Sequence, residues 1–336
     1  MIARGGQKAV RLRVDHLAVA VSLGILVAIQ ASYFTRGFVP GDALVYLAAG
    51  ERLNAGHELY SLQPGDREVG AKPPYWTVPL LSPPLVAVVW RPLAALPAEA
   101  GVWLWWAGTI GSIVVSIALL VRRRPLLASG AILVLAIPLA YEIGVGNVNA
   151  FLLLGMILVW RLVVAGRDTA AGALVGAMAA IKLAPIVLAW WLLVRRSWRG
   201  LGGVLAGALC GLLTGIAGAG VSPHVEYLSI ARTTLAIGTS DLSLAGIGRA
   251  VGLPSALAAV LPTVWLVVGL VLVAAVRHRP GLAFGLSVAT VVLASPVVNI
   301  NSYAMLLAAL APAAWPVPEA RAARATERPV PVEAGW

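Results

Sequence analysis

Long apolar runs alternate with short polar segments along most of the chain. The runs cover residues 14–34, 79–97, 102–121, 126–143, 148–165, 169–194, 201–220, 255–276, 281–297 and 303–316. They are continuous, whereas the strands of a membrane β-barrel alternate between apolar and polar positions. Runs of about 20 residues are typical of membrane-spanning helices. The pattern therefore predicts an all-α, polytopic integral membrane helical bundle with about ten crossings.

The composition excludes a soluble globular protein. Hydrophobic residues make up 60% of the 336 residues, charged residues 12%, and the mean hydropathy is +0.89. A soluble domain carries about 25% charged residues. We expect residues 1–316 to form a single transmembrane domain, with residues 35–78 as its first extracytoplasmic loop and residues 317–336 as a disordered cytoplasmic tail. The single cysteine, Cys210, excludes an internal disulfide.

The net charge of +11 is interpreted as a topology signal, so no nucleic acid partner is expected. Positive residues cluster between the apolar runs, at Arg122–Arg124, Arg161 and Arg167, Arg195 to Arg199, Arg277 and Arg279, and in the tail. The positive-inside rule places these clusters and both termini in the cytoplasm of a multi-pass plasma-membrane protein. It then requires the run 79–97 to be a short re-entrant or interfacial pair. It also requires 169–194 to be a hairpin with its apex near Lys182 and Pro185.

Polar residues that topology does not explain lie almost entirely on the extracytoplasmic side of this scheme. They are Asp42, Glu142, Asn147, Asn149, His224, Glu226, Asp241, Arg249, Asn299 and Asn301. This asymmetry predicts a site at the outer face. Local sequence favours Asp42 as the N-cap of a short helix, with a catalytic carboxylate as the alternative. Lys182 lies between apolar arms, and either reaches the interface or pairs with an anion such as phosphate.

Aromatic residues of the first loop offer a weaker signal. Tyr60, Tyr75 and Trp76 could stack on a sugar ring, although aromatic residues are also common at membrane interfaces. The four histidines form no i, i+4 pair, and no Asp-x-Asp pair is present. No metal site and no cofactor are therefore predicted.

Five segments, in this order, resemble glycosyltransferase family 87 of the GT-C superfamily. They are GDALVYLAAGERLNAGHELYSL at 41–62, LLSPPLVAVVWRPLAALP at 80–97, GNVNAFLLLG at 146–155, GALVGAMAAIKLAPIVLAWWLLVRRSWRG at 172–200 and DLSLAGIGRAVG at 241–252. Described members of the family include polyprenol-phosphate-mannose-dependent α-mannosyltransferases. The resemblance implies a GT-C-like helical fold.

The resemblance also implies roles for individual residues. It makes Asp42 the catalytic base, and Lys182 and Arg249 the partners of the donor phosphate. We also expect Asn147, Asn149, Ser243, Asn301 and Tyr303 to bind the substrate. The segment SPVVNINSY at 295–303 departs from the family pattern, because Asn299, Asn301 and Ser302 stand where an aromatic residue and histidines are expected.

The predicted function is sugar transfer, with mannose favoured, from a polyprenyl-phosphate donor to a lipid-linked or cell-wall glycan acceptor at the outer face of the membrane. Membrane lipids are the remaining expected partners. Three alternatives stay open. One is a transferase for arabinofuranose or glucose with another polyprenyl-phosphate donor. The others are a non-catalytic family member and a lipid transporter.

Overall fold

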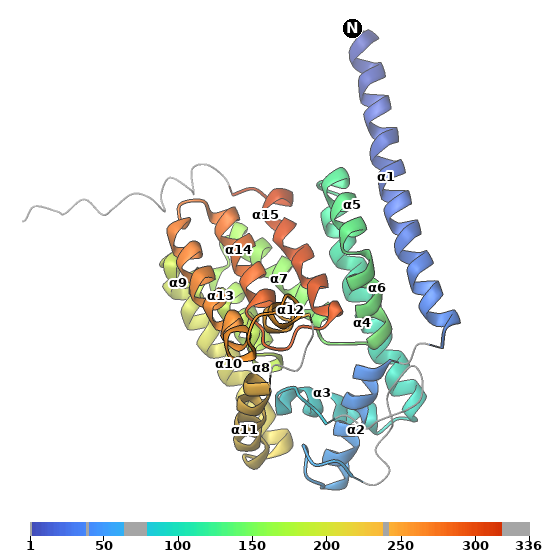
Figure 1. Ribbon diagram of the computed structural model, residues 1–336. Helices are drawn as coiled ribbons and strands as arrows, with labels where there is room; N and C mark the ends of the chain where they lie inside the picture. Colours follow the sequence, from blue (N-terminus) through green and yellow to red (C-terminus); the bar gives the residue numbers. More distant parts are fainter. Residues whose placement is uncertain (1, 38–39, 64–78, 238–241, 318–336) are drawn as a thin grey trace, which may run out of the picture.

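The computed structural model describes residues 2–37, 40–63, 79–237 and 242–317, and for residues 2–12 and 233–237 only the helical backbone. Within these ranges the chain is helical and contains no strand, which confirms the all-α prediction. Figure 1 shows the helices as a bundle, with α1 along one side.

Four helices are long and apolar enough to cross a membrane. They are α1 (Ile2–Thr35, with the apolar part Arg13–Thr35), α4 (Ala98–Val121), α10 (Trp198–Ala219) and α13 (Ser255–Ala275). A fifth span is formed if α5 (Pro125–Val134) and α6 (Ala136–Val145), which bend by 68° at their junction, are counted together. The described residues therefore provide four or five such helices, fewer than the predicted ten.

The other apolar runs form helices that are too short for a full crossing. They are α3 (Pro84–Ala94), α7 (Asn149–Val164), α8 (Asp168–Ile181), α9 (Val187–Val194), α14 (Pro280–Leu293), and the 3-10 helix η2 (Ile300–Leu310) with α15 (Ala311–Ala314). At 1.5 Å per residue, the 16 residues of α7 span about 24 Å, less than the hydrocarbon core of about 30 Å. The run 79–97 contains the single helix α3 rather than the predicted pair.

The predicted hairpin at 169–194 is present. Helix α8 ends at Ile181, and the chain turns through Lys182 and the short η1 (Ala184–Ile186) into α9. Ser197 Oγ donates a hydrogen bond to Asp168 Oδ2 at 2.7 Å, which brings the two ends of the hairpin together. Helix α10 then runs parallel to α8 at close range, because glycines line the contact. A Cβ atom at Gly203 would collide with the carbonyl of Thr169.

Three contacts gather the basic helix ends at one end of the bundle. Arg124 Nε donates to the carbonyl of Ala313 at 2.8 Å, and the Arg161 guanidinium lies 5.2 Å from the ring centroid of Trp315. The hydrogen bond between Asp168 and Ser197 brings the start of α8 and the start of α10 together at this end. The N-terminus of α1 lies toward the same end, whereas α2 (Gly41–Ala55), α3 and α11 (Ser222–Ile237) lie at the opposite end (Figure 1).

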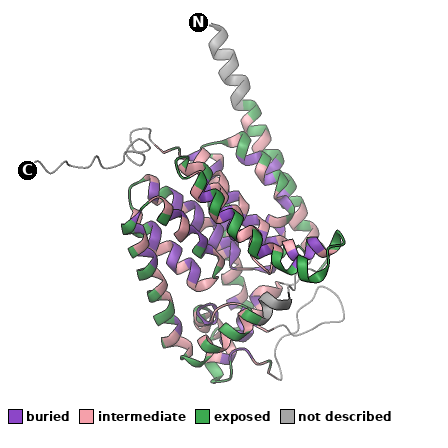
Figure 2. Ribbon diagram, turned by 60° about the vertical axis from the view of Figure 1, so that its left-hand side comes forward, coloured by how far each residue is buried: buried purple, intermediate pink, exposed green. Residues whose placement is uncertain are grey.

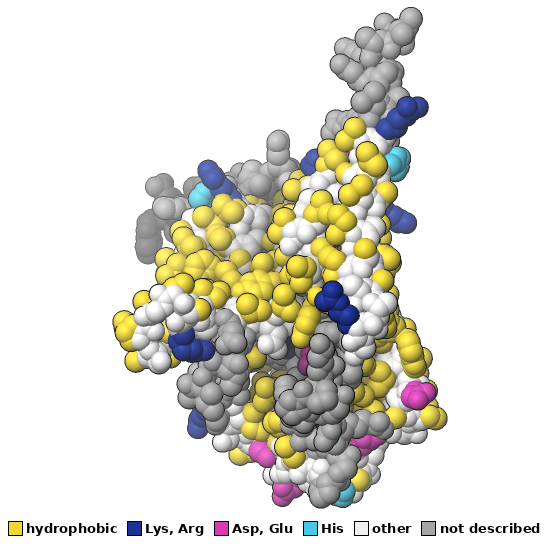
Figure 3. Space-filling view, turned by 45° about the vertical axis from the view of Figure 1, so that its right-hand side comes forward, with side chains coloured by type: hydrophobic (Ala, Val, Ile, Leu, Met, Phe, Trp, Pro, Cys, Tyr) yellow, Lys and Arg dark blue, Asp and Glu magenta, His cyan; other side chains and the backbone are white. Residues whose placement is uncertain are grey.

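The side surface between these ends is apolar. Figure 3 shows a broad hydrophobic surface, with acidic side chains gathered toward the end that carries α2. Outward-facing residues of α10 and α13 include Leu205 and Val271, which are 61% and 60% exposed. Exposed aliphatic side chains on spanning helices are expected where the solvent is lipid.

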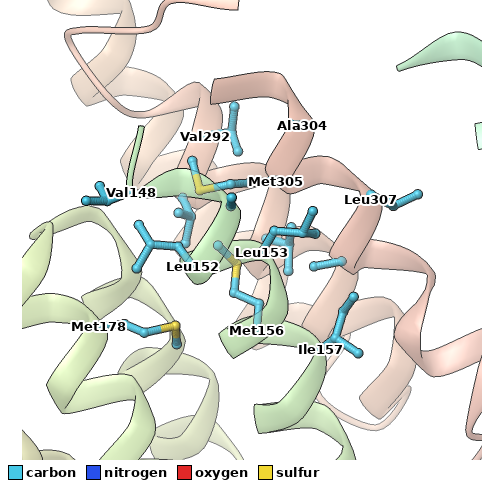
Figure 4. Packing of buried hydrophobic residues seen from close by; sticks show 14 of the residues in the cluster. Val148, Leu152, Leu153, Met156, Ile157, Met178, Val292, Ala304, Met305 and Leu307 are labelled. Atoms are coloured by element: carbon cyan, nitrogen blue, oxygen red, sulfur yellow. The ribbon is translucent and has the colours of Figure 1, made fainter. Parts of the chain in front are cut away.

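The core surrounds α7. Figure 4 shows Leu152, Leu153 and Met156 of α7 packed among Met178 of α8 and Met305 of η2. Figure 2 shows buried residues concentrated in the middle of the bundle and exposed residues toward its outside. The short helices α7, α14 and η2 are thus held by packing against one another, and α8 packs on α7 and on the longer α10.

Candidate active site

A row of hydrogen-bonded polar side chains crosses the interior at the points where the short helices end. Asn147 Nδ2 donates to Asp42 Oδ2 at 2.8 Å, and the backbone N–H of Asn149 donates to Asn147 Oδ1 at 3.1 Å. Lys182 Nζ donates to Asn149 Oδ1 at 2.8 Å. We call Asp42, Asn147, Asn149 and Lys182 the polar row. A carboxylate thus stands at one end of the row and an ammonium at the other.

The turn between α6 and α7 places the two asparagines. Gly146 ends α6 with φ of 68°, a conformation that favours glycine, and α7 begins at Asn149. Trp105 Nε1 donates to the carbonyl of Gly146 at 2.7 Å. A Cβ atom at Gly146 would lie 3.1 Å from Cβ of Ala43, so the turn fits closely against α2. This contact sets Asp42 beside Asn147.

The end of α8 places Lys182. The residue has extended backbone angles, φ −150° and ψ 125°, so the helix stops there, and Pro185 lies within η1 just beyond it. An ammonium has three N–H donors. Among the described residues its hydrogen-bond acceptor is Asn149 Oδ1, which leaves two donors for a ligand.

Asp42 does not cap its helix, so the N-cap prediction is wrong. Pro40 occupies the cap position of α2, and Asp42 lies in the first turn with its carboxylate on Asn147. The side chain is half-buried. Burial raises the pKa of Asp42 above its ordinary value, while the hydrogen bond from Asn147 and the positive charge of Lys182 oppose this shift. A carboxylate with a raised pKa is a stronger base.

Glu142 joins further elements to the polar row. It is 0% exposed, and its Oε1 accepts the backbone N–H of Ala150 at 2.8 Å. Its Oε2 accepts Asn149 Nδ2 at 3.3 Å and Asn301 Nδ2 at 2.9 Å. Asn301 of η2 therefore reaches the polar row through Glu142. The sequence marked Glu142 only as an unexplained polar residue, although a lone carboxylate in an apolar run is a signal of function.

Tyr46 lies one turn further along α2 than Asp42. Its ring is almost fully buried against Trp105, with centroids 5.9 Å apart, and against Trp90 at 6.3 Å. No local pattern in the sequence indicates this residue, because its partners Trp90 and Trp105 come from α3 and α4.

Other predicted site residues make contacts of their own. Tyr60 donates to the carbonyl of Ser82 at 2.9 Å and stacks on Tyr227 at 6.3 Å. Ser243 caps α12 (Leu244–Ala250) by accepting the N–H of Gly246 at 3.0 Å. Tyr303 donates to the carbonyl of Leu242 at 2.8 Å.

Arg249 takes no part in the hydrogen bonds of the polar row. Arg249 lies in the last turn of α12, which packs mainly on α13. Tyr75 and Trp76 lie outside the described residues. Within the described ranges no group of three or more His, Cys, Asp or Glu side chains could hold a metal ion.

A family model decides what kind of protein carries this site. The model of glycosyltransferase family 87 matches residues 81–296, more than half of the chain. The chain belongs to glycosyltransferase family 87. The matched region of this family 87 protein includes Glu142, Asn147, Asn149 and Lys182, whereas Asp42 and Asn301 lie on either side of it. No curated protein and no solved structure matches the chain. The protein is therefore a membrane glycosyltransferase by family and by its apolar helices.

Proposed function

We propose that this family 87 protein transfers a sugar, with mannose favoured, from a polyprenyl phosphate to a hydroxyl of a lipid-linked or cell-wall glycan. The observation that carries the proposal is the polar row, which holds Asp42 and Lys182 at its two ends inside an apolar bundle. Ionisable groups in such surroundings are costly and are usually retained for function. Transfer from a sugar phosphate needs a base and a cation, and the row supplies both.

The proposed reaction is a single displacement with inversion. The acceptor hydroxyl oxygen attacks the anomeric carbon while the bond from that carbon to the phosphate oxygen breaks. The hydroxyl proton passes to the carboxylate of Asp42, and the electron pair of the broken bond stays on the polyprenyl phosphate. The two unused N–H donors of Lys182 meet this negative charge, which grows in the transition state. The result is a glycosidic bond and a free polyprenyl phosphate.

Arg249 is the proposed second cation for the phosphate. Sugar contacts are proposed for Tyr60, Tyr75, Trp76 and the hydroxyl of Tyr303. In this proposal Asn147 and Asn149 hold the base and the cation in a fixed relation rather than reacting themselves. Preorganised donors and acceptors of this kind spare the reaction the cost of reorganising them.

The proposed orientation follows from the basic helix ends. The positive-inside rule assigns that end of the bundle to the cytoplasm, with both termini. Helix α2, which carries Asp42, then lies at the outer face of the plasma membrane. With Cys210→Ser as background, Glu58→Cys and Ser222→Cys should react with an impermeant thiol reagent added to intact cells, whereas Arg123→Cys should not. Labelling of only the Arg123→Cys protein would reverse the orientation.

The function is tested by transfer in lipid vesicles. Purified protein is given short-chain polyprenyl phosphates carrying mannose, glucose or arabinofuranose, with membrane lipid extract as acceptor, and products are identified by mass spectrometry. We expect a glycosylated lipid from one polyprenyl-phosphate donor, with mannose preferred. Transfer from nucleotide sugars alone, or from none of the donors by folded protein, would contradict the proposal.

A further inference from the structure

Glu142 is the most deeply buried charged residue of the site, yet it has no part in the reaction as proposed. We infer that Glu142 is a positioning residue, which fixes the orientation of the Asn149 side chain and thereby holds Lys182 ready for the donor phosphate. The inference rests on the proposed function, because it assigns the ligand of Lys182.

All hydrogen-bond partners of Glu142 are donors, and they come from two elements. Ala150 and Asn149 belong to the first turn of α7, and Asn301 belongs to η2. A carboxylate accepts hydrogen bonds at both oxygens and donates none. Glu142 thus accepts hydrogen bonds at the start of α7, where free N–H groups attract a negative charge. Through Asn301 it also links α7 to η2.

These contacts permit one orientation of the Asn149 amide. Its Nδ2 faces Glu142, which in the ionised form that suits its three donors can only accept, and its Oδ1 faces the Lys182 ammonium, which can only donate. The backbone N–H of Asn149 binds Asn147 Oδ1, and this leaves the Asn147 amide nitrogen for Asp42. The order of donors and acceptors from Glu142 through Asn149 to Lys182 is therefore set by an acceptor at position 142.

Glu142 is poorly placed to act as the base itself. Both of its oxygens already accept hydrogen bonds, and the side chain is 0% exposed. Asp42 is half-buried, and its hydrogen-bond donor among the described residues is Asn147. Asp42 thus keeps some exposed surface, whereas reaching Glu142 would require displacing the start of α7.

The variant Glu142→Gln tests the inference, because it keeps the shape and replaces an acceptor by a donor. If the new amide nitrogen takes the place of Oε2, Asn301 can turn, since its Oδ1 is buried and lacks a hydrogen-bond partner among the described residues. Asn149 can turn only by presenting its own nitrogen to Lys182, where two donors would meet. We expect folded protein with a donor KM raised about tenfold or more, and a smaller change in kcat.

A second substitution should restore the row. In Glu142→Gln with Asn149→Asp, the carboxylate at position 149 accepts from both the new amide and Lys182. The donor KM should return to within a few-fold of the parent value. Asn149→Asp alone places two carboxylates side by side and should not show this recovery. The control Asp168→Asn, at the far end of the bundle, should leave the donor KM unchanged.

Three results would overturn the inference. The first is a parental donor KM in Glu142→Gln. The second is a loss of kcat in that variant which the second substitution does not restore, because this would make Glu142 a reacting group. The third is a loss of thermal stability without a kinetic change, because this would leave Glu142 a purely structural role.

A measurement without any donor separates this inference from the proposed function. The chain has three lysines, Lys8, Lys72 and Lys182, so acylation of each can be followed by peptide mass spectrometry. Glu142→Gln should increase the acylation rate of Lys182 relative to Lys8, and the double variant should reverse the increase. Unchanged Lys182 reactivity would refute the positioning role even if no polyprenyl-phosphate sugar proves to be a substrate.

Discussion

Replacing Asp42 by asparagine or by alanine separates its chemical role from its structural one. The carboxylate is bound to Asn147 and lies in the first turn of α2 without capping it. Asparagine keeps the shape and can offer its side-chain oxygen to Asn147. Alanine leaves the Asn147 amide nitrogen without that acceptor. Neither side chain can take the proton of an acceptor hydroxyl.

The structure gives different magnitudes for the two variants. Asp42→Asn loses a negative charge from the first turn of a helix, which costs about 0.3–1 kcal/mol. It also removes the cost of burying that charge, so we expect unfolding free energy within about 1 kcal/mol of the parent. Asp42→Ala leaves the amide nitrogen of Asn147 without its hydrogen-bond acceptor, which costs about 1–3 kcal/mol. Loss of a general base lowers the rate by about 10²–10⁴ in both variants.

The assay compares transfer rates at saturating donor with thermal unfolding of the same preparations. We expect both variants to be nearly inactive and to bind donor, with alanine alone clearly less stable. An Asp42→Asn enzyme with more than about a tenth of parental turnover would lie outside the range of base catalysis and would refute the assignment.

Three further predictions concern the charge at Lys182, the fall of the turnover rate at acid pH and the packing of α8 on α10. Lys182→Ala should raise the donor KM about 10- to 150-fold, the loss expected for a charged hydrogen bond, and unchanged kinetics would remove the phosphate role. The turnover rate should fall as the pH drops through the raised pKa of Asp42, because only the ionised carboxylate accepts a proton. Lys182→Met removes a charge that lowers this pKa, so the acid limb of the pH–rate profile should move to higher pH, and an unmoved limb would argue against their coupling. Gly203→Ala should destabilise the protein by about 1–3 kcal/mol in thermal unfolding, whereas Gly202→Ala, which faces open space, should be neutral or slightly stabilising; equal effects would contradict the close α8–α10 contact.

The sequence predicted the long helices well and the number of crossings poorly. Residues 102–121, 201–220 and 255–276 correspond to α4, α10 and α13, because each run is apolar throughout, and α13 continues across Pro262. The count failed where a helix is interrupted without a polar segment. The bend of 68° between α5 and α6 lies inside the apolar run 126–143, where no polar segment marks it. The runs 148–165 and 281–297 hold helices of only 16 and 14 residues, although their apolar length is close to the template of about 20 residues.

The sequence indicated only part of the site. Asp42, Asn147, Asn149 and Lys182 stood out as polar residues that topology did not explain, and the structure joins them. Glu142 acquires its role from Asn301, which lies 159 residues further along the chain, and no local pattern reveals such a contact. Ser243 matched a family motif, yet its hydroxyl caps α12.

The most direct test of the polar row as the transfer centre is a structure of the protein in lipid with a non-transferable analogue of a polyprenyl-phosphate sugar. We predict a phosphate oxygen about 2.7–3.2 Å from Lys182 Nζ, with the anomeric carbon turned toward Asp42. A phosphate bound elsewhere, with Lys182 still bonded only to Asn149, would contradict the account.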